Sequence, residues 1–184
     1  MQAKTSNQFD NVTANPVANE ANSIGYQNNI DYSKFQAVNI ESPLNGLTPA
    51  SAPNAALVSV DGDVLSGQLT LAPQQTATKS DAIRYFDLVQ LFFGCSANGL
   101  NAAASIAVGC SIEVSGYNTA GQMVGIASFN YANNELVKAT MARAILPASF
   151  VGLVNYTIAL AVSSDDADAA TVILFDNVTH INYW

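Results

Sequence analysis

Two aspartates occupy equivalent positions in the closest repeat of the sequence, and they are its first candidates for chemistry. Residues 9–13 and 175–179 both read Phe-Asp-Asn-Val-Thr, which pairs Asp10 with Asp176. Carboxylate oxygens are ligands that Ca²⁺ prefers in proteins. If the first and last strands of the fold are neighbours, the two aspartates can meet at one structural Ca²⁺.

The surroundings of Asp176 decide whether its carboxylate is buried. The Phe, Val and Thr content of both copies predicts β-strands, and residues two apart in a strand share a face. Asp176 then shares a face with Leu174 and Val178, which would belong to the core. A carboxylate there must be paired, hydrogen-bonded or metal-bound, because burying it alone is costly. In the alternative register Phe175 points inward and Asp176 faces water, and the sequence leaves both open.

Catalytic chemistry finds little support in the sequence. The single histidine, His180, falls on the predicted last strand as an ordinary strand residue, without a nucleophile elbow of the G-x-S-x-G kind. One histidine and two cysteines that are expected to be bonded do not supply the three or four ligands of a zinc site. The sequence contains no phosphate-binding glycine loop. Acids such as Asp31, Glu41, Asp87 and Glu113 have nothing to place two of them across one cleft, as glycoside hydrolysis requires. We therefore predict a protein that is not an enzyme.

Two acidic turns are further candidates for a hard cation. Asp61-Gly62-Asp63 is foremost a turn signal. The loop with Asp165, Asp166 and Asp168 lacks the terminal Glu of an EF-hand. We interpret both segments as solvated loops.

The two cysteines, Cys95 and Cys110, each lie at the edge of an apolar run, with a stretch rich in Ala, Gly and Asn between them. A disulfide closing this loop would stabilise the protein by about 3 kcal/mol, and the alternative is two buried free thiols. The low charge favours the disulfide and therefore an oxidising compartment. We predict a secreted protein, extracellular or in a cell wall, and expect Met1 to stand where a secretion signal was removed.

Composition narrows the class of partner. Only 11% of the 184 residues are charged while 49% are hydrophobic, so the surface must be built from uncharged polar residues, which suit neutral ligands such as glycans. The net charge of −8 offers no basic patch for nucleic acid and disfavours an anionic membrane surface. No apolar stretch is long enough to insert into a membrane.

The elements that must position these residues are strands. Runs with strand character are separated by turn signals, without the rhythm of βαβ units; the runs are 35–40, 56–60, 83–93, 112–117, 123–131, 150–162 and 171–183. We predict one all-β domain over residues 1–184, a single antiparallel β-sandwich of jelly-roll type, with residues 1–7 as an N-terminal tail. Residues 135–144 are the one candidate for a short helix, and residues 41–53 are expected to form a long loop.

The order of short motifs along the chain resembles a known class. An initial Phe9-Asp10 is followed by Gly25-Tyr26, Phe86-Asp87-Leu88, a Val114–Tyr117 strand and the closing Phe175–Val178. This order resembles the small secreted fungal proteins of the jelly-roll, galactose-binding-like class, which share their architecture with many carbohydrate-binding modules. The resemblance implies glycan binding, and a structural Ca²⁺ whose ligands here would be Asp10 and Asp176.

A sugar platform in this chain must use tyrosines, because its only tryptophan is the terminal Trp184. The candidates for ligand binding are Tyr26, Asp31, Tyr32 and Tyr117, with Tyr131 as a further tyrosine. We predict a non-catalytic protein that recognises a neutral glycan, either a cell-wall polysaccharide or a glycoprotein glycan. The alternative is a structural or effector protein at a cell surface that acts through protein–protein contacts, as a homo-oligomer or larger assembly, with edge pairing of its apolar last strand.

Overall fold

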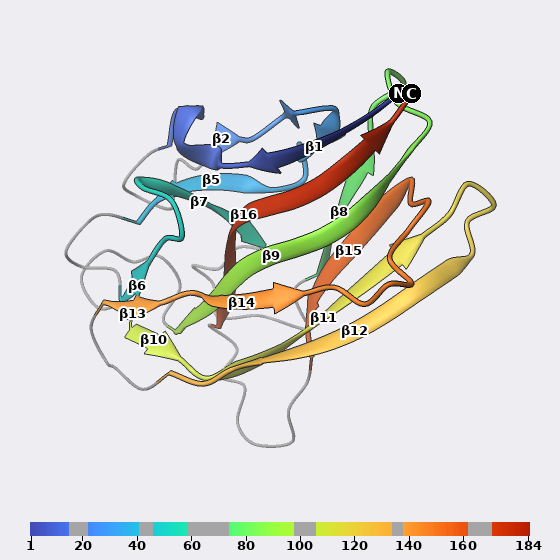
Figure 1. Cartoon of the computed structure of the whole chain (residues 1–184). Helices are drawn as coiled ribbons and strands as arrows, with labels where there is room; N and C mark the ends of the chain where they lie inside the picture. Colours follow the sequence, from blue (N-terminus) through green and yellow to red (C-terminus); the bar gives the residue numbers. More distant parts are fainter. Residues whose placement is uncertain (15–21, 41–45, 59–73, 98–105, 134–137, 162–170) are drawn as a thin grey trace.

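A computed structural model describes residues 1–14, 22–40, 46–58, 74–97, 106–133, 138–161 and 171–184. These residues form two large antiparallel sheets packed face to face, which confirms the predicted all-β sandwich (Figure 1). No helix in these ranges is long and apolar enough to cross a membrane.

The larger sheet has eight strands. Its central path runs in the order β10 (Ile106–Val108), β9 (Tyr85–Ala97), β16 (Val172–Tyr183), β7 (Asn54–Val58), β5 (Gln36–Asn39) and β2 (Asn22–Ser23). The remaining two strands are β1 (Gln2–Asn7), which pairs with β16, and β14 (Ala142–Ile145), which pairs with β9. The last strand is therefore internal, flanked by β9 and by β1 and β7, and it is not available for edge pairing.

The smaller sheet has six strands. They run in the order β12 (Met123–Tyr131), β11 (Cys110–Tyr117), β15 (Asn155–Leu160), β8 (Gln74–Lys79), β4 (Ile30–Asp31) and β3 (Tyr26–Gln27). A separate parallel pair joins β6 (Leu47–Thr48) to β13 (Ala139–Thr140). The predicted run 123–131 coincides with β12, and the other runs overlap β5, β7, β9, β11, β15 and β16.

Two predicted elements are wrong. Residues 1–7 are not a tail, because residues 2–7 form β1, whose backbone pairs along β16 without needing apolar side chains. The predicted helix over 135–144 is not present in its described part, where β13 and β14 run instead. Alanine favours helices, but pairing of β14 with β9 overrides that local preference.

Aromatic rings fill the core between the sheets where the two ends of the chain meet. The ring of Phe175 packs edge-on against Phe35 at 5.0 Å and Phe9 at 5.7 Å, measured between ring centroids. Tyr32 packs edge-on against Phe9 at 5.2 Å, and all four side chains are fully buried. Such contacts contribute about 0.5–1.5 kcal/mol per pair beyond the area they bury.

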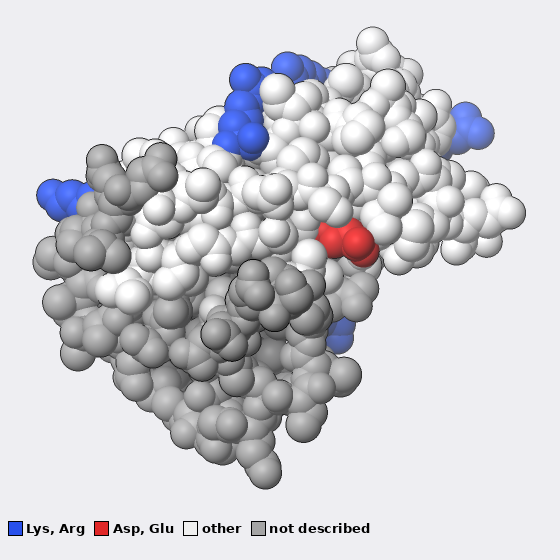
Figure 2. Space-filling model, turned by 90° about the horizontal axis from the view of Figure 1, so that it is seen from below, with Lys and Arg blue, Asp and Glu red and all other residues white. Residues whose placement is uncertain are grey.

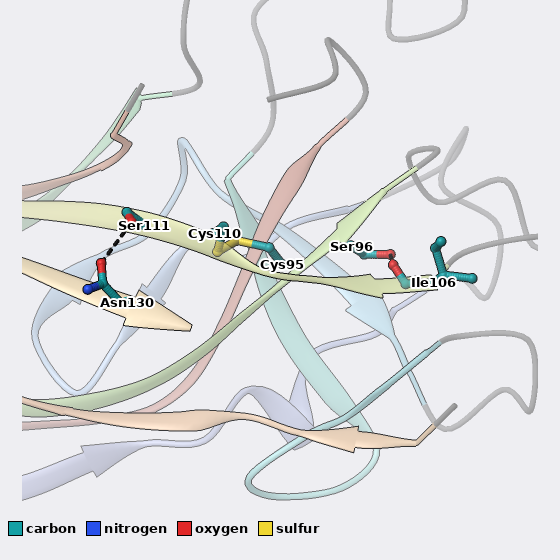
Figure 3. The surroundings of a disulfide bond; sticks show 6 residues. All are labelled: Cys95, Ser96, Ile106, Cys110, Ser111 and Asn130. Carbon is teal, nitrogen blue, oxygen red and sulfur yellow. Dashed lines mark hydrogen bonds between the residues drawn. A yellow bond between two sulfur atoms is a disulfide. The ribbon is translucent and has the colours of Figure 1, made fainter. Parts of the chain in front are cut away.

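The predicted disulfide between Cys95 and Cys110 is confirmed, and it joins the two sheets (Figure 3). Cys95 lies on β9 of the larger sheet and Cys110 opens β11 of the smaller one. The chain passes from β10 to β11 beside this bond, so the disulfide fixes the point at which it changes sheets. Next to it, the Ser111 hydroxyl donates to Asn130 Oδ1 at 2.8 Å and ties β11 to β12.

Candidate functional site

The two Phe-Asp-Asn-Val-Thr segments lie next to each other. The rings of Phe9 and Phe175 are in contact, and Asp10 is close enough to act electrostatically on Asp176. The first copy is not a strand, contrary to the prediction. Residues 9–11 form the 3₁₀ turn η1 (Phe9–Asn11), closed by a hydrogen bond from the Val12 N–H to the Phe9 carbonyl. The repeat therefore brings two aspartates together from a turn and a strand.

Asp176 is fully buried, on the side of β16 opposite to Phe175. Its Oδ2 accepts hydrogen bonds from the Ser51 N–H at 2.6 Å and the Ser51 hydroxyl at 3.0 Å. Its Oδ1 accepts from the Asn177 N–H at 2.6 Å. Neither register considered from the sequence is right in full. Phe175 points into the core, as in the alternative register, but Asp176 does not face water, because the segment that carries Ser51 covers it.

The pKa of the Asp176 carboxyl is raised from 3.8 to about 6, mainly because burial penalises its charged form. Hydrogen bonds from Ser51 and Asn177 oppose this rise, and the negative charge of Asp10 adds to it. A cation bound by Asp176 would offset this penalty, because it would stabilise the charged form of the carboxyl.

A bulge at Asn177 explains why simple alternation along β16 fails. The pairing of β16 with β9 shifts between Asp176 and Thr179, and Asn177 has φ 48°. Beyond this bulge His180 is buried, its ring packing against Phe86. Its Nε2 lies 2.9 Å from the Thr5 hydroxyl. His180 therefore lies in the core, on the opposite side of the sheet from Asp176. Burial lowers its pKa, so the imidazole is neutral.

Asn54 holds the turn that carries Asp10. Its backbone N–H donates to Asp10 Oδ1 at 3.3 Å, and its Nδ2 donates to the carbonyls of Val12 at 2.8 Å and Phe9 at 3.2 Å. The buried Oδ1 of Asn54 accepts no hydrogen bond in the described part of the chain. Two carboxylates and this amide oxygen are all hard ligands of the kind Ca²⁺ takes.

Within the described ranges, no group of three or more His, Cys, Asp or Glu side chains is placed to hold a metal ion. A cation at Asp10 and Asp176 would therefore need carbonyl, amide or water oxygens for the rest of its shell. The acidic turns at 61–63 and 165–168 lie outside the described residues.

The outer face of the six-stranded sheet carries a second candidate site. One row of directly opposed residues crosses five of its strands, from β3 to β11: Tyr26, Asp31, Thr78, Asn155 and Tyr117. Directly opposed residues point to the same side of a sheet. The structure thus places three of the four predicted ligand-binding residues in a single row. Tyr26 is 65% exposed and Tyr117 is half-buried.

Asp31 is held in position by Ser33, whose N–H donates to its Oδ1 at 2.8 Å. Tyr32, the next residue, does not belong to the row. Alternation turns it into the core, where its hydroxyl accepts from Asn7 Nδ2 at 2.9 Å and from the Tyr156 hydroxyl at 3.2 Å. Burial raises the pKa of Tyr32 to about 12. Because its ring is fully covered, it cannot stack on a ligand, and the prediction for Tyr32 is corrected.

Tyr131 is likewise a core residue, only 4% exposed and packed against Phe93. Small, mostly polar side chains cover much of the rest of the described outer face, with Glu113 as the one acid besides Asp31: Thr76, Ser111, Glu113, Ser115, Ser128, Asn130, Thr157 and Ala159. Two exposed apolar side chains of β12 share this face, because Ile126 lies opposite Ser115 and Met123 opposite Tyr117. Seen from the side on which β11, β12 and β15 lie in Figure 1, the described surface is largely uncharged, with Lys and Arg toward its margins (Figure 2).

Sequence reasoning missed an aromatic pair on the larger sheet. Tyr85 and Tyr183 are directly opposed on β9 and β16, and their rings stack with centroids 4.6 Å apart. The Tyr183 hydroxyl donates to Asp87 Oδ2 at 2.8 Å, and this hydrogen bond is the main reason why the pKa of Tyr183 is raised. Asp87 also accepts from the Gly152 N–H at 2.9 Å. Its carboxylate therefore has structural partners on both oxygens.

The chain matches no protein-family model and no curated protein. Among solved structures it is similar to a DUF4465 family protein from Bacteroides caccae, with 17% identity, 80% of this chain and 73% of that chain covered, and a TM-score of 0.49. It is also similar to the arabinose-bound α-L-arabinofuranosidase MgGH51, with 16% identity over 98% of this chain and a TM-score of 0.50. This chain spans only 26% of that enzyme.

The chain is also similar to CBM28, a carbohydrate-binding module described as specific for non-crystalline cellulose. The identity is 16%, the match covers 93% of this chain and 95% of that module, and the TM-score is 0.42. At these identities the similarities concern the β-sandwich fold. What the site binds must be argued from its own residues.

Proposed function

We propose that this protein binds a neutral glycan on the outer face of its six-stranded sheet, without catalysis. The observation that carries the proposal is the row from Tyr26 to Tyr117, in which two tyrosines flank a carboxylate, a hydroxyl and an amide. Tyrosine rings offer an apolar face to the C–H side of a sugar ring, and their hydroxyls remain available for hydrogen bonds. The polar residues between them supply donors and acceptors for sugar hydroxyls.

The dimensions and charge of the row favour an extended, uncharged ligand. Four steps between neighbouring strands separate Tyr26 from Tyr117, a distance of roughly 19 Å at the usual strand spacing. An oligosaccharide segment matches this length better than a single sugar. The net charge of −8 and the carboxylates of Asp31 and Glu113 disfavour acidic polysaccharides.

Affinity electrophoresis through gels with embedded polysaccharides tests this proposal. Neutral polymers such as β-glucan, galactomannan and arabinoxylan are compared with polygalacturonate, and at least one neutral polymer is expected to retard the protein. Tyr26→Ala and Tyr117→Ala should each weaken binding about tenfold, as expected for removal of an aromatic contact. Tyr85→Ala, a partly exposed tyrosine on the other sheet, is the matched control and should bind normally.

Retardation by none of the neutral polymers would contradict the function. Retardation that both variants preserve, or that Tyr85→Ala abolishes equally, would instead contradict the location of the site.

We also propose that Asp10 and Asp176 hold a structural Ca²⁺ that ties the N-terminal turn to the last strand. The support is the closeness of the half-buried Asp10 to the buried Asp176, together with the buried Asn54 Oδ1, which has no hydrogen-bond partner in the described part of the chain. The metal would supply positive charge beside the buried carboxylate of Asp176, and it would contribute to stability rather than to a reaction.

Thermal unfolding after EDTA treatment, with and without added Ca²⁺, tests this site. A ligand that binds only the folded state raises the unfolding temperature, so Ca²⁺ should raise it in the wild type and not in Asp176→Asn. Asp81→Asn, which alters an exposed turn, is the control and should keep the response. A wild type that ignores Ca²⁺, or an Asp176→Asn variant that still responds, would remove the metal from this site.

The disulfide supports a location outside the reducing cytosol. We propose an extracellular or cell-wall location, where polysaccharides are accessible.

A further inference from the structure

The six-stranded sheet ends at β12, a long edge strand. β12 pairs with β11 on one side, and no other described strand pairs with its second side (Figure 1). Edge strands of this length offer rows of backbone N–H and C=O groups to another strand, and proteins usually protect them.

The sequence of β12 lacks the charged residues and prolines that usually protect an edge strand. Its nine residues, Met-Val-Gly-Ile-Ala-Ser-Phe-Asn-Tyr, contain no charge and no proline. The other described edge strands are protected or short: β1 carries Lys4, β14 carries Arg143, and β2, β3 and β10 have two or three residues each. The register with β11 shifts only near Met123, so residues 125–131 pair regularly.

Apolar side chains also remain exposed along this strand. Met123 is 51% exposed and Ile126 is 54% exposed. Isolated exposed apolar residues are ordinary on protein surfaces. Here they coincide with an unpaired, charge-free edge, which is where another strand would cover them.

We propose that β12 pairs antiparallel with β12 of a second copy of this chain. A two-fold axis at Ala127 would place Ile126 opposite Ser128 of the second copy, and the reverse pair would be identical. Whatever the register within residues 125–131, no charged side chain of β12 faces another, so no pair of like charges forms directly across this edge. Self-pairing is favoured over a basic partner for the same reason, because the edge offers no charge for such a partner to recognise.

Pairing of this kind would join the six-stranded sheets of two copies into one continuous sheet. The rows that begin at Tyr26 would then lie on one shared surface, and a long polymer could contact both copies. The inference about β12 does not depend on glycan binding, and its test uses no glycan.

The test measures molar mass by light scattering over a wide range of protein concentration. The wild type is expected to form a dimer that dissociates on dilution. Ile126→Lys and Ser128→Lys each place two charges at the pairing edge, and each should raise the dimer dissociation constant at least tenfold. Ile145→Lys, which changes a 60% exposed residue on β14 of the other sheet, is the matched control and should dimerise like the wild type.

Amide hydrogen exchange at high and low protein concentration identifies the surface. Residues 125–131 should gain protection as the dimer forms, while residues 142–145 should not. A protein that stays monomeric at millimolar concentration would overturn the proposal. So would a dimer that tolerates both lysine variants, or one in which β12 gains no protection.

Discussion

The burial of Asp176 predicts that its carboxyl destabilises the fold as the pH rises, in the absence of a bound cation. The folded-state pKa of about 6 lies above the ordinary value of 3.8. The stabilising contribution of the protonated carboxyl to the unfolding free energy is therefore fully present below pH 4 and is lost as the pH rises through 6. A difference of about two pH units corresponds to about 3 kcal/mol of unfolding free energy.

The pH dependence of the wild type alone does not isolate this effect, because His180 acts in the opposite direction. The pKa of His180 is lowered in the fold, so its contribution is present above pH 6.5 and is lost as the pH falls. The comparison with Asp176→Asn removes this term, since both proteins carry His180. The asparagine loses one of the two carboxylate acceptors that face backbone N–H groups, but this cost does not change with pH.

The assay is urea unfolding in EDTA, followed by circular dichroism at five values between pH 3.5 and 7.5. The unfolding free energy of the wild type minus that of Asp176→Asn should fall by about 3 kcal/mol between pH 4 and 6.5 and then stay constant. A difference that rises over this range would refute the reasoning. It would mean that the hydrogen bonds from Ser51 and Asn177 stabilise the carboxylate more than burial penalises it.

Three further predictions concern stability and are checked by the same unfolding measurement. Replacing Cys95 and Cys110 together by alanine should cost about 3 kcal/mol, and a loss near zero would contradict the role of the disulfide in holding the sheets. Asn177→Val should cost about 1–3 kcal/mol because of its positive φ, whereas Asn177→Gly should cost less; equal losses would argue against a left-handed residue there. Gly125→Ala should cost about 1–3 kcal/mol, because the new methyl group would lie 2.9 Å from the buried ring of Phe150, and an unchanged midpoint would show that the ring can move.

The elements that could be predicted from the sequence are those whose side chains alternate strongly between the two faces. The run 123–131 matches β12. The repeat made it a question whether its two copies are neighbours, and only the structure answers it, with the rings of Phe9 and Phe175 in contact. The low charge of the chain, together with two cysteines at the edges of apolar runs, correctly favoured their bond over two free thiols.

The features that could not be predicted depend on details of the backbone that the hydrophobic pattern of the sequence does not contain. One extra residue at Asn177 changes which side chains of β16 face the core, and only the tolerance of asparagine for a left-handed backbone hints at it. The assignment of Tyr32 to a ligand site overlooked that its neighbour Asp31 already faces outward. β1 could not be predicted, since an edge strand held by backbone hydrogen bonds needs no apolar side chains.

The pairing of β1 with β16 has a mechanical consequence. The two strands run antiparallel with Gln2 opposite Tyr183, and the Trp184 N–H donates to the Met1 carbonyl at 3.3 Å, so both ends of the chain emerge side by side (Figure 1). Tension applied between these ends would load the hydrogen bonds one pair at a time and separate β1 from β16, starting at Gln2. Tension applied through one end only would leave this pair unloaded. The pairing of β1 with β16 is therefore expected to resist tension between the two ends only weakly, because its hydrogen bonds would break in sequence rather than together.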